Sequence, residues 1–207
     1  MRHSRGLAVA FAFASWSSTA WAQPRPYTID RAGSHVVVHV GKTGLFGFAG
    51  HEHEIRAPLD HGTLVVDLAH VETSSADLRF DARTLRVVAE GEPVKDVPKV
   101  QAAMVGPQCL DVGRFPEITF VASAIGTKGS ARGGLELSVG GTLTLHGVSR
   151  AVTVPVHIMV GDDLLSATAL MTLKQTDFGI EPISVAGVVK VKDELRIEVT
   201  LVARRAR

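Results

Sequence analysis

Two histidines and two glutamates alternate in residues 50–55, the stretch GHEHEI. Imidazole and carboxylate groups are the usual ligands of zinc and copper and the usual acid–base groups of enzymes. Successive side chains of a β-strand point to opposite faces, so His51 and His53 would share one face and the two glutamates the other. The acids then cannot partner the histidines within this strand, and a metal site would need ligands from elsewhere.

Those further ligands would have to come from His35, His39, His61 or His70. His35 and His39 alternate with an apolar row, so we expect them to face solvent, while His61 lies in a predicted turn. The chain has only one cysteine, and no ligand set that would complete a site with His51 and His53 is recognisable. Metal binding by the GHEHEI histidines stays an alternative hypothesis.

Nucleophilic catalysis would need a nucleophile beside a base. No Gly-x-Ser-x-Gly elbow occurs, and Cys109 has only Gln108 and Leu110 as its neighbours in sequence. We interpret Cys109 as a small buried hydrophobic residue that forms no intramolecular disulfide. The sequence therefore predicts a protein that is not an enzyme and has no catalytic residues, cofactor or resident metal.

The N-terminus has the organisation of an export signal. Basic residues precede an apolar run at residues 7–14, and Ala20–Ala22 supplies the small-x-small motif of a cleavage site. The run is shorter than the ~20 residues that span a bilayer. We predict a signal peptide at 1–22, one domain at 23–207, and a periplasmic or otherwise exported protein with no transmembrane segment after cleavage.

Composition limits the partners of this domain. The chain is 45% hydrophobic and 21% charged, which allows a full core, and its formal net charge is only +1. Binding to phosphate backbones needs a clustered excess of Lys and Arg, so we do not expect nucleic acid as a partner. The sequence leaves open whether the protein forms a homodimer.

Hydrophobic residues recur with a period of two along most of the chain, which indicates β-strands with one apolar face. Only residues 97–105 favour a helix, and another helical turn is expected near 176–179. The apolar rows are Leu135–Leu145, Val152–Val160, Leu165–Leu173 and Leu195–Leu201, with shorter rows at Val36–Val40, Leu64–Leu68, Leu85–Val87 and Ile118–Phe120.

About eight such strands joined by short turns predict an all-β fold, either an antiparallel barrel or a sandwich. Strands of ten or more residues favour the barrel, because strands in immunoglobulin-type sandwiches are shorter. A barrel of about eight strands is wide enough to hold one small ligand. An apolar lining would suit a long apolar molecule, bound through the area that it removes from water.

Four segments in this order resemble the YceI-like family. They are Tyr27–Asp30 with Ser34–Val36, Gly113–Phe120, Gly141–Arg150 and Thr176–Ile180. The resemblance covers about residues 27–203 and implies an antiparallel lipocalin-like β-barrel of about eight strands with one or two short helices. It also implies export and an elongated lumen, in which members hold a polyisoprenoid or an isoprenoid-quinone-like chain.

The resemblance thus implies a periplasmic binding or carrier protein for an isoprenoid or quinone-like lipid. At residues 49–53 and 97–101 the chain departs from the family pattern, which leaves the head group of the lipid open. We expect His51 and His53 at the mouth of the barrel, as rim residues or as partners of that head group. The residues expected against the lipid chain are Val36, Val38, Val40, Phe120, Leu143, Leu145 and Phe178.

Two alternatives from other classes remain. The first is a metal-binding envelope protein or metal-dependent enzyme that uses His51 and His53 as ligands. The second is a structural or stress-related envelope protein whose lumen holds no ligand.

Overall fold

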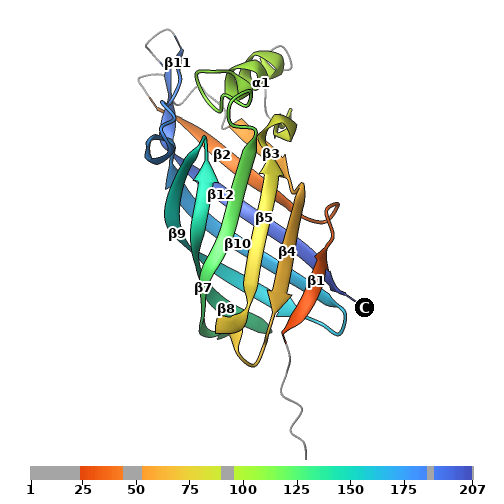
Figure 1. Cartoon of the computed structure of the whole chain (residues 1–207). Helices are drawn as coiled ribbons and strands as arrows, with labels where there is room; N and C mark the ends of the chain where they lie inside the picture. Colours follow the sequence, from red (N-terminus) through yellow and green to blue (C-terminus); the bar gives the residue numbers. More distant parts are fainter. Residues whose placement is uncertain (1–23, 44–52, 90–95, 186–188, 207) are drawn as a thin grey trace, which may run out of the picture.

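The structure, a computed structural model, describes residues 24–43, 53–89, 96–185 and 189–206 (Figure 1). The predicted signal peptide and His51 lie outside the described residues. The strands are β1 (Arg25–Ile29), β2 (His35–Thr43), β3 (His53–Pro58), β4 (His61–Val66), β5 (Ser75–Asp81), β6 (Arg86–Val87), β7 (Glu117–Ala131), β8 (Gly134–Leu145), β9 (Val148–Val160), β10 (Leu164–Lys174), β11 (Ser184–Val185) and β12 (Val189–Arg205). The helices are η2 (Val71–Thr73), η3 (Ala82–Thr84), α1 (Val97–Val105) and η4 (Gln175–Phe178).

Antiparallel pairing closes the sheet into a barrel. The ring runs through β1, β4, β5, β7, β8, β9, β10 and β12, and Tyr27 of β1 pairs with Arg205 of β12 to complete it. β2, β3 and β6 extend the wall at one end, because β2 pairs with the remaining length of β12 and β3 pairs with β2 and β6. The prediction of an antiparallel barrel of about eight strands is confirmed.

A short turn separates β1 from β2 along the same edge of β12. The Asp30 carboxylate accepts hydrogen bonds from the backbone N–H groups of Ala32 and Gly33, at 3.1 and 3.2 Å, which is the usual way an aspartate initiates a turn. Ser34, which is buried, then donates to the Val202 carbonyl and accepts from the Val202 N–H. This pair of bonds holds the turn against β12 where the ladder is interrupted.

The β8–β9 hairpin turns through two residues, His146 and Gly147, with φ of 52° and 73°. Two successive positive φ values are typical of the tight hairpin turn whose twist matches that of the strands. Position 147 also excludes a side chain, because a Cβ there would lie 2.6 Å from the Phe115 ring. Leu145 and Val148 close the ladder directly beside the turn.

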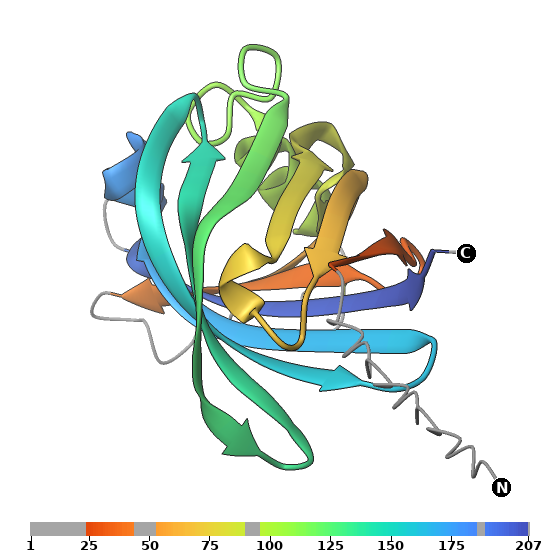
Figure 2. The same ribbon diagram turned by 60° about the horizontal axis from the view of Figure 1, so that its bottom comes forward.

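The two ends of the barrel differ. α1 and β11 lie at one end, which we call the α1 end (Figure 1). At the opposite end the β7–β8 hairpin projects beyond the neighbouring strands (Figure 2), and β7 and β8 remain paired out to Ala131 and Gly134. The helix predicted at 97–105 coincides with α1, and the expected helical turn near 176–179 is η4. No helix among the described residues is long and apolar enough to cross a membrane.

Candidate functional site

A cavity of ≈ 410 Å³ lies inside the barrel and has an almost wholly apolar lining. The lining comes from nine strands, β2 to β5, β7 to β10 and β12, and α1 contributes Val100, Ala103 and Met104. It extends from Leu110 at the α1 end to Val71 at the opposite end. A volume of this size is typical of ligand-binding pockets, which span about 300–1,000 Å³. The cavity therefore suits an apolar molecule rather than a polar substrate.

Most of the residues predicted to contact a ligand lie on this lining. The two-residue periodicity placed them there, because alternate side chains of each strand point into the barrel. The lining residues are Val36, Val38 and Val40 on β2, Phe120 on β7, and Leu143 and Leu145 on β8. Contact of these side chains with a ligand stays a prediction.

Phe178 lies elsewhere. It is 1% exposed and packs in a core cluster with Leu173 and Ile180, and it is not part of the cavity lining. The chain leaves the sheet after Lys174 and enters η4, so beyond Gln175 the alternation that aims side chains inward no longer applies. The placement of Phe178 against a ligand is corrected to a place in the protein core.

Of the GHEHEI histidines, the structure describes His53. It begins β3 and lines the cavity together with Ile55, as the strand pattern predicts. Glu54 lies on the other face, where it is opposite His39 of β2. Among the described residues, no group of three or more His, Cys, Asp or Glu side chains is placed to hold a metal ion.

The alternation of side chains along β2 predicts the direction of His39 but not its contacts. It points away from the lumen as predicted, yet its side chain is only 16% exposed, because its Nε2 lies 3.2 Å from the Glu198 carboxylate on β12. Arg196 also contacts this carboxylate, at 2.8 Å. His39 therefore lies against a carboxylate of the neighbouring strand on the outer wall rather than free in solvent.

Cys109 and Gln175 are among the lining residues that the sequence reasoning missed. Burial raises the pKa of the Cys109 thiol, which keeps it in the unreactive protonated form. Gln175 could have been found, because it continues the period-two row of β10, Met171 and Leu173, by one further step.

Three of the four segments that resemble the YceI-like family meet at the α1 end. They are Gly113–Phe120, Gly141–Arg150 and Thr176–Ile180. Arg114 stacks on the Phe115 ring at 5.0 Å, and that ring packs edge-on against His146, with the ring centroids 4.5 Å apart. His146 Nδ1 donates to the Phe178 carbonyl at 3.2 Å, and Arg150 Nε donates to the Asp177 carbonyl at 2.8 Å. Arg114, Phe115, His146 and Arg150 therefore position η4 against the β8–β9 turn and do not line the cavity.

Asp193 of β12 anchors the start of η4. Its carboxylate accepts hydrogen bonds from the Thr176 N–H at 2.9 Å and from the Thr176 hydroxyl at 2.8 Å. These bonds, the backbone one foremost, lower the pKa of Asp193 below its usual range despite the opposing effect of burial. The charged carboxylate is therefore the form that the folded state favours.

We expect Asp193→Ala to destabilise the protein at pH 7, and the difference from wild type to shrink in acid. Because the folded-state pKa is lowered, the contribution of Asp193 is fully present above its unfolded pKa and is lost as the pH falls through the folded value, below about 4. Urea unfolding at pH 7, 5 and 3 measures this, with Asp162→Ala in the exposed β9–β10 turn as control. A pH-independent difference would contradict a role for the carboxylate charge.

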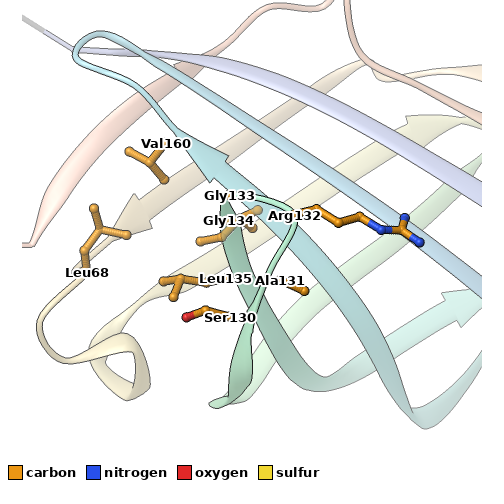
Figure 3. Close-up of a pocket in the computed structure, with 9 residues that line it drawn as sticks. Leu68, Ser130, Ala131, Arg132, Gly133, Gly134, Leu135 and Val160 are labelled. Atoms are coloured by element: carbon orange, nitrogen blue, oxygen red, sulfur yellow. The ribbon is translucent and has the colours of Figure 1, made fainter.

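A second, surface pocket lies at the end opposite α1. It has a volume of ≈ 540 Å³ and is formed by Leu68, the β7–β8 turn and Val160. Leu68 and Val160 border the pocket, while the Arg132 side chain points away from them (Figure 3). Ile158 lines both this pocket and the barrel cavity, so the pocket adjoins that end of the lumen.

Comparison with known proteins gives one family and several structures of like fold. The model of the family described as YceI-like domain matches residues 27–203. No curated protein matches the chain.

The chain is similar to BcnA of Burkholderia cenocepacia, with 22% identity, a TM-score of 0.65, and coverage of 84% of this chain and 98% of that one. It is also similar to a polyisoprenoid binding domain from Saccharophagus degradans that is implicated in plant cell wall breakdown, with 14% identity, a TM-score of 0.61, and coverage of 87% and 98%. A YceI protein of Campylobacter jejuni matches with 14% identity, a TM-score of 0.53, and coverage of 73% and 85%. These likenesses show a shared fold.

Proposed function

This chain belongs to the YceI-like domain family, and we propose that it is a carrier protein that holds a long apolar isoprenoid lipid inside its barrel. The observation that carries the proposal is the cavity of ≈ 410 Å³, whose lining side chains are almost all Val, Leu, Ile, Ala, Met or Phe. Removing an apolar chain from water into such a lining is favourable by roughly 25 cal/mol per Å² of buried area. The cavity offers few hydrogen bonds, so affinity comes from that area.

The comparisons support a lipid of the isoprenoid class. One structure of like fold is a polyisoprenoid binding domain. At 14% identity this similarity shows a shared fold, and the shared ligand class is part of the proposal. Within the proposal, Val36, Val38, Phe120 and Leu143 contact the chain of the lipid. His53 lies toward its polar end.

The carrier works outside the cytoplasm in this proposal. Support comes from residues 1–22, whose basic start, apolar run and small-x-small motif are typical of a cleaved signal peptide. The proposal includes no chemical step. Cys109, which lines the cavity, has a raised pKa, and no base partners its thiol among the residues that the structure describes.

Extraction tests the proposal. Protein purified from its native host, extracted with organic solvent and analysed by mass spectrometry, should release an isoprenoid lipid in near-stoichiometric amount. An unrelated exported protein taken through the same purification is the control for lipid carried over from membranes. An extract with no more isoprenoid than this control would reject the carrier function.

A further inference from the structure

Gln175 is a buried polar residue in the wall of an otherwise apolar lumen. It is 6% exposed, opens η4, and lines the cavity. Its amide Nε2 donates to the Lys192 carbonyl at 2.7 Å. A backbone carbonyl can only accept, so the amide nitrogen must face Lys192 and the amide oxygen must point elsewhere. The orientation of this side chain is therefore fixed by chemistry.

Among the described residues none donates a hydrogen bond to the Gln175 amide oxygen, and this oxygen is not one of the fully buried side-chain atoms that lack a partner. The other glutamine that supports the fold behaves differently. Gln101 of α1 accepts from the Val87 N–H at 2.9 Å and donates to the Leu85 carbonyl at 3.0 Å, so both ends of its amide are used. Within the part of the chain that the structure describes, Gln175 thus uses its amide nitrogen and not its amide oxygen.

Gln175 lies at the same end of the lumen as His53. Pairing links His53 on β3 to Val40, Val40 to Leu195 on β12, and Leu195 to Leu173 on β10, which forms one level around the wall. Gln175 follows Leu173 by two residues. Two polar residues of the lining, His53 and Gln175, therefore lie at the α1 end of the lumen.

The opposite end of the lumen offers less to a head group. Val71 and Leu165 are buried there, with exposed fractions of 9% and 2%. Ser74 already accepts a hydrogen bond from the Asp67 N–H at 3.0 Å, and Ser75, although it is on the lining, is exposed to solvent. An amphiphilic lipid would consequently bind with its chain toward Val71 and its polar end toward Gln175.

We propose that Gln175 selects lipids whose polar end donates a hydrogen bond: the hydroxyl of an isoprenoid alcohol, phenol or quinol, in preference to an ether or an oxidised quinone. This rests on the carrier function proposed above. A lipid that fills the lumen excludes water, so the amide oxygen then depends on the ligand for a donor. A ligand without one leaves a buried acceptor unpaired, which is unfavourable.

Equilibrium binding of two radiolabelled ligands tests the proposal. Geranylgeraniol and its methyl ether share the same chain and differ in one hydroxyl proton. We expect wild-type protein to bind the alcohol about tenfold more tightly than the ether. Equal binding of both overturns the selection by Gln175 and leaves the carrier function standing, whereas binding of neither ligand overturns the carrier function itself.

Two variants assign the preference to one atom. Gln175→Met keeps the length of the side chain but removes the acceptor, so we expect the alcohol-to-ether ratio to fall to about one, with ether binding close to that of wild type. Gln101→Met removes two backbone hydrogen bonds outside the lumen, so it should lower stability and keep the tenfold ratio. A Gln175→Met protein that still prefers the alcohol tenfold would overturn the assignment.

Discussion

Ala169→Trp is expected to abolish lipid binding while the barrel stays folded. Ala169 lies midway along β10, where it pairs with Val156 on one side and Val199 on the other, and its side chain lines the cavity. An indole placed there occupies the space that the lipid chain would need. Because the cavity of ≈ 410 Å³ accommodates the larger side chain, we expect little of the strain that overpacking a filled core produces.

The readout is lipid recovered per mole of folded protein, measured by mass spectrometry after organic extraction. We expect roughly a tenfold or larger drop for Ala169→Trp, since the bound chain loses the apolar contact area that drives its binding. Leu170→Trp is the matched control, because the neighbouring Leu170 points outward and is 52% exposed. Equal lipid content in both variants would mean that the lipid does not occupy the lumen.

Much of the lumen could be predicted from the sequence because strand periodicity is a local property. Val36, Val38 and Val40 share a face whatever the barrel around them, and the structure places all three on the lining. The same reasoning correctly separated His53 from Glu54. The prediction of the lining residues therefore rested mostly on the alternation of side chains along each strand.

The remaining features depend on contacts between distant parts of the chain. The sequence predicts the helix at 97–105, but not that Met104 would reach the lumen wall. It places His39 outward, but the Glu198 partner is set by the register of β2 on β12. The orientation of the Gln175 amide likewise depends on the Lys192 carbonyl, which a different β10–β12 register would not bring near.

For Phe178, the sequence and the structure give opposite predictions. As a ligand contact, its replacement by alanine would weaken lipid binding and change stability little. As a core residue, 1% exposed and packed with Leu173 and Ile180, its replacement would leave a cavity that the surrounding η4 and β8–β9 residues can only partly fill. The structure favours the second outcome.

We therefore expect Phe178→Ala to lower the free energy of unfolding by about 3–5 kcal/mol, the usual range for a buried phenylalanine. The loss includes weakened support for the Phe178 carbonyl, which accepts the His146 hydrogen bond that fixes the β8–β9 turn. Urea denaturation measures the change, and Leu170→Ala, on the exposed face, should stay within about 0.5 kcal/mol of wild type. At temperatures where the variant is folded, its lipid content per mole should equal that of wild type, because Phe178 does not line the lumen. A variant of near-normal stability that has lost its lipid would instead place Phe178 against the ligand.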